Sequence, residues 1–378
     1  MIRRSSDGTL IIRVMTSPRL SWAIGTLCLA GLASLGCSST PGAGGTGGSG
    51  GGGGSPPAPS GLPVPPGASD LPKPSGTPGN LKVLDWAGFR SALTYTFDDA
   101  QPSQIEHYAD LQATGVRLTF FVTSGNSGAS ANFDATFTQA VRDGHEIGNH
   151  TVHHCHVDLT GCSTGSSASL ASELDDCTSY VTGHFGQAAV WTAASPYGDT
   201  GYDLPDADRF FLNRGVSGGS IAPGDGTDPF NLPCHAAVSG ETVDGFNSAI
   251  DTAHTSGRWL IMLIHTLMPS TANWYAPIDI SVVSGSVSHA QGLGDVWIDS
   301  LVKVGAYWRA QKAVSATTPT AAGASQTWTW TLPPHFPPGQ YLRATVDGGT
   351  LTQGGTPVPW DGHGYYEISL DVGSLTLS

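Results

Sequence analysis

Two adjacent carboxylates and a cluster of histidines are the residues in this sequence that could bind a metal ion and transfer protons. Asp98 and Asp99 end an apolar run over residues 92–97, where one carboxylate could bind a metal and the other could act as a base. His150 and His154 are four residues apart, a spacing that places two imidazoles on one side of a helical turn. The pattern predicts a site of two histidines and one carboxylate. The competing interpretations are a simple Asp-Asp turn and solvent-facing histidines.

Two further segments carry residues that could contribute to such a site. Ser195-Pro196-Tyr197-Gly198 predicts a turn that could aim a backbone N–H and an aromatic ring into a pocket. His265 follows the apolar run 259–264, and a polar residue at the end of a buried strand is a candidate general acid or base. Each segment also has a structural interpretation, the first as an ordinary turn and the second as a buried histidine of the core.

These residues must be positioned by a fold in which strands and helices alternate. Apolar and β-branched runs bounded by turn residues predict strands, and apolar positions at helical spacing predict helices. The alternation implies an α/β fold with a mostly parallel sheet, open or closed into a barrel, whose chemistry lies at the carboxyl ends of the strands. The predicted strands are residues 92–97, 117–122, 145–149, 188–192 and 259–264, and the predicted helices are 101–114, 133–141, 167–181, 247–254 and 296–312.

The last part of the chain has a different pattern. Short runs rich in β-branched and aromatic residues, at 328–332, 341–346, 365–370 and 374–377, alternate with Gly, Pro and Asp turns. They predict a small antiparallel β domain over residues 316–378. This domain could cap the larger one structurally, or it could bind sugar.

Composition excludes several classes of function. The chain has 378 residues with Lys+Arg 16 against Asp+Glu 30, a formal net charge of −14, so it would repel a nucleic-acid backbone or an anionic bilayer. Charged residues make up only 12%, while Gly (51) and Pro (26) are abundant, a profile that suits an exported protein. We therefore expect neither a nucleic-acid partner nor a polytopic membrane protein.

The N-terminal residues indicate export. A basic segment, an apolar run and the pair Gly36-Cys37 resemble a bacterial lipoprotein signal over residues 1–37, in which Cys37 would carry the lipid. An ordinary secretory signal with an incidental cysteine is the alternative. Residues 38–80 are mostly Gly, Pro, Ser, Thr and Ala, so we expect a disordered linker between the anchor and a catalytic domain over residues 81–315.

Four cysteines remain in the predicted folded part, namely Cys155, Cys162, Cys177 and Cys234. An even number in an oxidising compartment predicts two disulfides. Zinc ligation is the competing interpretation, but no Cys-x-x-Cys pair supports it. Three pairings are possible, and the sequence does not choose among them.

The motifs as a set resemble those of the NodB-like polysaccharide deacetylases, the fourth carbohydrate esterase family. In order they are Thr-Phe-Asp-Asp at 96–99, Gly-His-Glu-Ile-Gly-Asn-His-Thr-x-x-His at 144–154, Ser-Pro-Tyr-Gly at 195–198 and Leu-x-His at 263–265. The resemblance covers about residues 83–315. It implies a distorted (β/α) barrel that hydrolyses acetyl groups with the help of a bound metal.

The resemblance also assigns roles, residue by residue. Asp98 would be the general base and His265 the general acid, while the Tyr197 backbone N–H would join the metal in stabilising the oxyanion. Zn²⁺ is the expected ion, with Co²⁺ or Ni²⁺ as alternatives, because this kind of ligand set is tolerant. The metal ligands would be Asp99, His150 and His154.

The sequence departs from the family pattern in two motifs. The arginine that the family has two residues before the proline of the third motif is Ala194 here, and we hypothesise that Arg214 supplies the missing charge from another loop. The family's Asp-x-x-Asp-Trp-like fourth motif is not evident, and Asp228 or Trp274 could fill parts of its role. The expected substrate-binding residues are Pro196, Trp274 and Arg214.

The predicted function is metal-dependent N-deacetylation of a polysaccharide that contains N-acetylglucosamine, such as peptidoglycan or chitin. The alternatives are O-deacetylation of an acetylxylan-like glycan and a non-catalytic, glycan-binding surface lipoprotein. The presence of both a base and an acid argues against a mere binder. The expected location is the cell envelope or surface, with the outer membrane preferred, and otherwise the secreted fraction. The glycan, the metal and the oligomeric state are left open.

Overall fold

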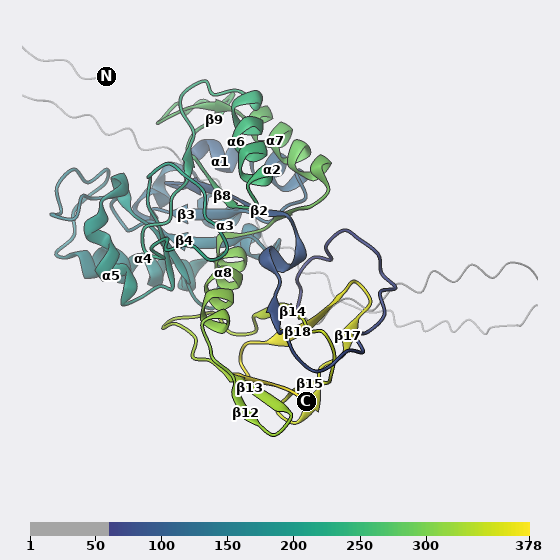
Figure 1. Ribbon diagram of the computed structural model, residues 1–378. Coiled ribbons are helices and arrows are strands. Elements are labelled where there is room, and N and C mark those ends of the chain that lie inside the picture. Colours follow the sequence, from purple (N-terminus) through teal and green to yellow (C-terminus); the bar gives the residue numbers. More distant parts are fainter. Residues whose placement is uncertain (1–59) are drawn as a thin grey trace, which may run out of the picture. The chain divides into compact units, whose positions relative to one another are not determined.

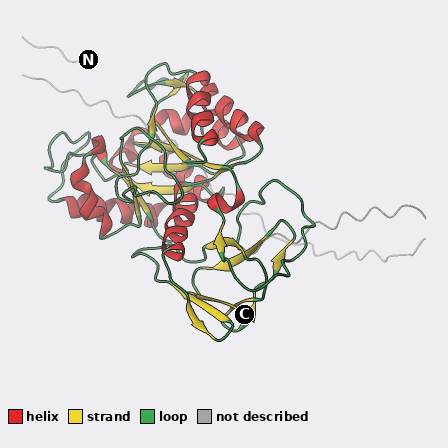
Figure 2. Cartoon of the chain, in the orientation of Figure 1, coloured by secondary structure: helices red, strands yellow, loops and turns green. Residues whose placement is uncertain are grey.

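A curled parallel sheet forms the centre of the computed structural model, which describes residues 60–378 (Figures 1 and 2). The strands of this sheet are β2 (Ser91–Asp98), β3 (Thr119–Val122), β4 (Glu146–Asn149), β5 (Thr192–Ala194), β6 (Leu212–Arg214), β7 (His235–Ala236), β8 (Trp259–Ile264) and β11 (Val296–Ile298). Their order is β6-β5-β4-β3-β2-β8-β7, with β11 beside the start of β2. β2 therefore lies near the middle, where both of its neighbours are parallel to it.

One short segment closes this sheet into a barrel. Leu232 pairs with Arg214 of β6 in a parallel bridge, and the Leu232 backbone N–H donates to the Asn213 carbonyl at 3.0 Å. Three residues further along, His235 begins β7, which pairs with β8. Residues 232–236 thus contact first one edge of the sheet and then the other. The distorted (β/α) barrel predicted from the sequence is confirmed.

The alternation of side chains along β2 decides which residues face the barrel interior. Leu93, Tyr95 and Phe97 belong to the hydrophobic cluster under the outer helices. Because successive side chains of a strand point to opposite faces, Thr96 and Asp98 point into the barrel. Every residue of β2 is buried, but the side chains that point into the barrel include polar ones, and the last of these is Asp98 at the carboxyl end of the strand.

The helices surround the sheet, and two of the predicted helices differ most from the observed ones. The predicted helix over residues 101–114 divides at His107, whose ring contacts Asp110 and the Pro269 carbonyl, each at 2.8 Å. The predicted helix over 296–312 begins only at Leu301, because residues 296–298 form β11. The helices are α1 (Pro102–Glu106), α2 (Tyr108–Ala113), α3 (Phe133–Arg142), α4 (Leu170–His184), α5 (Asp203–Ala207), α6 (Val243–Thr255), α7 (Ile280–Leu293) and α8 (Leu301–Ser315).

Between Ser60 and Ser378, no helix combines the length and the hydropathy that a membrane crossing needs.

The amino end of the barrel is occupied by α8. The buried Glu146 carboxylate, at the start of β4, accepts hydrogen bonds from Thr119 Oγ1 at 2.9 Å and from Thr192 Oγ1 at 2.6 Å. It also accepts one from the Val302 backbone N–H at 2.8 Å, in the first turn of α8. A carboxylate at a helix N-terminus satisfies a free backbone donor and suits the helix dipole. These hydrogen bonds close the amino end of the barrel, so a ligand site can form only at the opposite, carboxyl end of the strands.

The C-terminal strands form two antiparallel sheets, as the sequence predicts for this part of the chain (Figure 1). They are tied to the preceding residues, because β1 pairs with β14 and because Trp308 of α8 shares a hydrophobic cluster with Trp328 and Leu342. The strands are β1 (Lys82–Val83), β14 (Tyr341–Thr345), β18 (Tyr365–Ser369) and β17 (Trp360–Asp361) in one sheet, and β12 (Thr320–Ala322), β13 (Ser325–Thr329), β19 (Ser374–Leu377), β15 (Leu351–Gln353) and β16 (Thr356–Pro357) in the other.

Residues 60–80, which we expected to be disordered linker, are packed against the C-terminal sheets. The buried Arg343 guanidinium donates to the Pro63 carbonyl at 2.7 Å, and Ser60 Oγ donates to Glu367 at 2.7 Å. Further along, the Leu71 backbone N–H donates to the Gly362 carbonyl at 2.8 Å. Residues 60–80 have few apolar side chains to bury, and these hydrogen bonds to the C-terminal sheets hold the segment in place instead. The predicted signal segment with Cys37, and residues 38–59, lie outside the described residues.

The cysteines form one disulfide in place of the two that we predicted. Cys155 and Cys162 are bonded, whereas Cys177 and Cys234 are free and buried. The two free thiols belong to different hydrophobic clusters, and each contacts a backbone carbonyl at 3.3–3.5 Å. They behave as small core residues, which is a common role for cysteine.

Asp206 of α5 is a buried carboxyl group whose two oxygens have no hydrogen-bond partner among the described residues. Burial, reinforced by Asp203 and opposed by Arg209, raises its pKa well above the usual range. Folding favours the neutral form of the Asp206 carboxyl group. The contribution of this group to the free energy of unfolding is therefore present at low pH and is lost as pH rises through the folded-state pKa.

We therefore predict that Asp206→Asn is more stable than the native chain at pH 7, by about 1–3 kcal/mol, and that the difference shrinks as pH falls below the raised folded-state pKa and is lost by about pH 4. Denaturant unfolding of both proteins between pH 3.5 and pH 8 measures the difference, in which the other titrating groups cancel. A difference that does not change with pH would contradict the prediction.

Candidate active site

The carboxyl end of β2 brings two aspartates into one site. Asp98 is the last residue of β2, and only 2% of its surface is exposed. Asp99 and Ala100 have left-handed φ angles of 73° and 54°, which turn the chain sharply so that both carboxylates line the same cleft. Two side-chain amides hold this turn: Gln104 Nε2 donates to the Asp98 carbonyl at 2.6 Å, and Asn126 Nδ2 donates to the Asp99 carbonyl at 2.8 Å.

The two histidines follow β4 in a loop, which corrects the helical turn that we predicted for them. His150 is the first residue after β4, and Thr151 and His154 have left-handed φ angles of 64° and 51°. The Thr151 hydroxyl accepts a hydrogen bond from the His154 backbone N–H at 2.9 Å and so closes the loop. The two rings lie 4.8 Å apart between centroids, so this loop brings the imidazoles together as a helix would have done.

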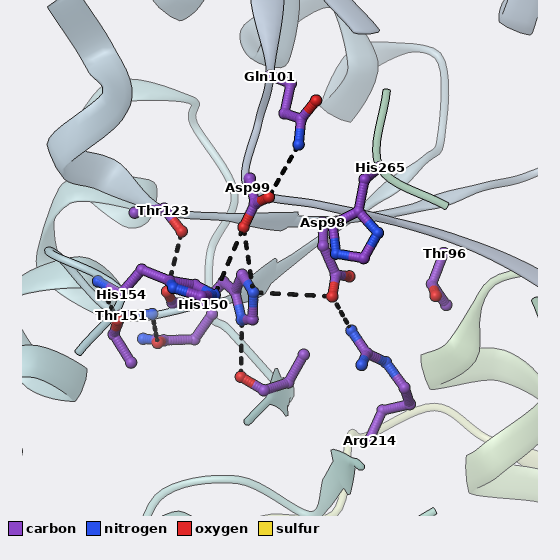
Figure 3. Close-up of polar contacts among 12 residues, drawn as sticks. Thr96, Asp98, Asp99, Gln101, Thr123, His150, Thr151, His154, Arg214 and His265 are labelled. Carbon is purple, nitrogen blue, oxygen red and sulfur yellow. Dashed lines mark hydrogen bonds and ion pairs between the residues drawn. The ribbon is translucent and has the colours of Figure 1, made fainter. Parts of the chain in front are cut away.

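Asp99, His150 and His154 converge on one point (Figure 3). Asp99 Oδ1 lies 3.5 Å from His150 Nε2 and 3.6 Å from His154 Nε2, and the three donor atoms lie within 4.8 Å of one another. The ligand set predicted from the sequence is therefore assembled. Among the residues that the structure describes, no other group of three or more His, Cys, Asp and Glu side chains has this geometry.

The chemistry of these donors fits a divalent metal ion. Burial opposes the protonation of His150, but Asp98 and Asp99 raise its pKa, so a metal at Nε2 would displace a proton. His150 Nδ1 lies 2.8 Å from the Ala194 carbonyl oxygen, which can only accept, so Nδ1 carries a hydrogen and Nε2 is the atom left to bind the metal. Such a hydrogen bond behind a histidine is the usual support for a metal ligand. One carboxylate and two imidazoles also leave coordination positions free for water and substrate.

Burial and charge set the protonation of this cluster. Burial opposes the ionisation of Asp99, but the hydrogen bond and charge of His150, with His265 and His154 adding to them, hold its pKa below the usual range. Burial, reinforced by His150, lowers the pKa of His154 to about 4. At pH 7 the first group is a carboxylate and the second a neutral imidazole, which are the forms that bind a metal.

Asp98 is paired with an arginine from a neighbouring strand. The Arg214 side chain is fully buried, and its guanidinium forms an ion pair with Asp98 Oδ2. Arg214 lies on β6 and not in a loop, and its partner in the register of β5 and β6 is Ala194. Paired residues of adjacent parallel strands project from the same face, about 4.8 Å apart. Arg214 therefore brings its charge to the face on which an arginine at Ala194 would have stood.

The second oxygen of Asp98 is free. Asp98 Oδ1 is buried and has no hydrogen-bond partner within residues 60–378. His265 lies one residue beyond β8, and its Nδ1 is also buried without a hydrogen-bond partner among these residues. Burial lowers the pKa of this imidazole. The site therefore holds one carboxylate oxygen and one imidazole nitrogen with no partner, which suits a base and an acid.

A cleft of about 870 Å³ opens above these groups. The predicted residues Asp98, Asp99, His150, His154, Tyr197, His265 and Trp274 line it. Pro196 and Arg214, which we expected to bind substrate, do not, because both are buried behind the cleft wall.

The sequence analysis missed Tyr275, which lines the cleft and packs edge-on against His265 at 4.8 Å between ring centroids. The signal that could have found it is the aromatic pair Trp274-Tyr275, whose rings are 44% and 69% exposed. Large exposed rings at the rim of a cleft are typical of ligand contact.

Comparison with known proteins agrees with this site. Residues 90–209 match the family model described as polysaccharide deacetylase. The matched segment includes Asp98, Asp99, His150, His154 and Tyr197 of the site. A protein from Arthroderma benhamiae named as a peptidoglycan-N-acetylglucosamine deacetylase is 23% identical over 222 residues, which cover 54% of this chain and 50% of that protein. A chitin deacetylase from Pestalotiopsis is 27% identical over 128 residues, covering 31% of this chain and 41% of that protein.

The chain also resembles solved structures. The Xyl-CE4 domain of a multidomain xylanase from the hindgut metagenome of Trinervitermes trinervoides aligns with a TM-score of 0.39 and 17% identity, over 56% of this chain and 88% of that domain. The chain spans about half or less of the length of the curated relatives that it matches.

We predict that Asp99→Ala weakens the binding of Co²⁺ to the metal-free protein by at least about 100-fold, because it removes the carboxylate that lies beside both histidines. Isothermal titration measures the affinity. The matched control is His184→Ala, which removes a surface histidine that pairs with Asp134 at 2.9 Å, and it should leave Co²⁺ binding unchanged. Equal affinities for the native chain and Asp99→Ala would contradict the prediction.

Proposed function

We propose that this protein hydrolyses acetyl groups from a polysaccharide that contains N-acetylglucosamine, in a reaction that depends on a divalent metal. The observation that carries the proposal is the single cleft in which Asp99, His150 and His154 lie beside the unpartnered oxygen of Asp98 and the unpartnered nitrogen of His265. A binding site for neutral sugar needs neither a metal site nor an acid and base beside it.

The proposed roles follow from the contacts of each group. A divalent metal held by Asp99, His150 and His154 would polarise the acetyl carbonyl and acidify a water molecule. Asp98 accepts the proton of the attacking water at Oδ1, while Arg214 keeps Oδ2 occupied and fixes the carboxylate plane. His265 donates a proton to the departing nitrogen, which is otherwise a poor leaving group. The Tyr197 backbone N–H donates to the oxyanion.

The substrate proposed is a glycan chain, with Trp274 and Tyr275 as the rings that contact sugar. Both residues are exposed and line the cleft, and Tyr275 also packs against His265. The curated relatives named for peptidoglycan and chitin point to N-acetylglucosamine polymers. Zn²⁺ is the proposed ion, since the donor set of two imidazoles and one carboxylate is one that Zn²⁺ commonly accepts.

We further propose that the protein is exported. The Cys155–Cys162 disulfide supports this, because such bonds persist in oxidising compartments. Lipidation at Cys37, and the division into a catalytic domain over residues 81–315 and a C-terminal β domain over 316–378, remain parts of the same proposal.

The first test is acetate release by the full chain, stripped of metal and then reloaded with Zn²⁺ or Co²⁺. Acetylated chitooligosaccharides, peptidoglycan and acetylxylan are offered in parallel, so that their ranking separates N- from O-deacetylation. We predict that Asp98→Asn lowers the rate by about 10²–10⁴-fold, because the base is lost, while glycan affinity stays within about threefold. Native protein that binds glycan and metal but releases no acetate would identify a binding protein instead.

Arg214 gives a second prediction. We expect Arg214→Ala to lower kcat by roughly 10–100-fold with little change in KM, because the guanidinium orients Asp98 but does not line the cleft. The double variant Ala194→Arg/Arg214→Ala should regain part of the rate, since it returns a guanidinium to the same face of the sheet. Steady-state kinetics measure both. If Arg214→Ala folds and keeps the native kcat, Arg214 has no part in catalysis.

A further inference from the structure

The loop that begins at the metal ligand His154 is closed on itself. Cys155, the next residue, is bonded to Cys162, and the Tyr202 hydroxyl donates to the Cys155 carbonyl at 2.8 Å. Cys155 is fully buried. The position of His154 is therefore coupled to the eight-residue ring that the disulfide makes of residues 155–162.

The side chain of Tyr197 contacts this ring from the opposite wall of the cleft. The Tyr197 hydroxyl donates to the Gly161 carbonyl at 2.5 Å. Its aromatic ring stacks on His156 at 3.9 Å between centroids and meets His154 edge-on at 4.5 Å. Tyr197 itself has a left-handed φ of 57°, a conformation that a bulky residue keeps only when its surroundings hold it.

Asp199, two residues after Tyr197, makes a second connection to the same ring. Its Oδ2 lies 2.9 Å from His156 Nδ1 and accepts a hydrogen bond from the Val157 backbone N–H at 3.2 Å. The turn that carries Tyr197 is thus bound to the disulfide ring at two separate points. One of them lies beside Gly161 and the other near Cys155.

We propose that the disulfide ring 155–162, with the side chains of Tyr197 and Asp199, is a positioning device that holds the metal ligand His154 and the backbone N–H of Tyr197 in fixed relation to each other. This inference rests on the proposed function, in which these two groups act on the same acetyl group. Its consequence is that contacts outside the metal site, made by residues that do not touch the metal, set the affinity for it.

The test measures Co²⁺ affinity by competition with a chelating dye, and the visible spectrum of the Co²⁺ protein, which reports the geometry around the ion. The variants are Cys155→Ala/Cys162→Ala and Tyr197→Phe, which removes only the hydroxyl. We expect about 10–100-fold weaker Co²⁺ binding for the first and about tenfold for the second, each with an altered spectrum. When the two changes are combined, the fold-loss of Co²⁺ affinity should be smaller than the product of the two separate losses, because both changes loosen the same disulfide ring 155–162.

The matched control is Tyr180→Phe, which removes a tyrosine hydroxyl hydrogen-bonded to Asp134 at 2.6 Å, away from the cleft. It should leave affinity and spectrum unchanged. Native affinity and spectrum in both Tyr197→Phe and the cysteine variant would overturn the inference. If the cysteine variant does not fold, Tyr197→Phe against Tyr180→Phe decides alone. Failure of the native protein to bind Co²⁺ would instead contradict the proposed function.

Discussion

The buried pair between Arg214 and Asp98 is the interaction on which the arrangement of the site depends. A carboxylate with 2% of its surface exposed cannot remain charged at the mouth of a barrel without a partner, and the guanidinium supplies it. The pair occupies one carboxylate oxygen and leaves the other without a hydrogen-bond partner among the described residues. The pair also constrains the fold. Arg214 must lie on a strand whose barrel-facing side chains come close to Asp98 at the end of β2.

Closure of the barrel meets that requirement. β6 is an edge strand of the sheet, and Arg214 would be open to solvent there if residues 232–236 did not pair with β6 on one side and β8 on the other. The bridge between Arg214 and Leu232 buries the arginine completely. A short and irregular strand thus matters to the charge of the site, since it helps to keep water from the ion pair of Asp98 and Arg214.

Much of the barrel was predictable from sequence, and the failures have identifiable causes. The long apolar run of β8 was predicted to the residue, because a buried strand bounded by polar residues has few alternatives, whereas the bounds of the other predicted strands of the barrel shifted. β6 was missed since three residues give no periodicity, and α7 was missed since its many Ser and Gly residues conceal an apolar stripe that includes Val283 and Val287. Pairing of cysteines and the packing of residues 60–80 depend on contacts distant in sequence, which local patterns do not encode.

The helical spacing of the two histidines gave the correct pairing for an incorrect reason, and the difference bears on how the site works. In a helix, hydrogen bonds of the backbone itself would hold two ligands four residues apart. Here the left-handed conformations of Thr151 and His154 make the turn. Such a conformation destabilises a non-glycine residue by about 1–3 kcal/mol, so contacts with neighbouring residues must stabilise it. The placement of the two imidazoles that we propose as metal ligands is therefore set by side-chain contacts around the loop, and removing one of these contacts should displace an imidazole before it unfolds the barrel.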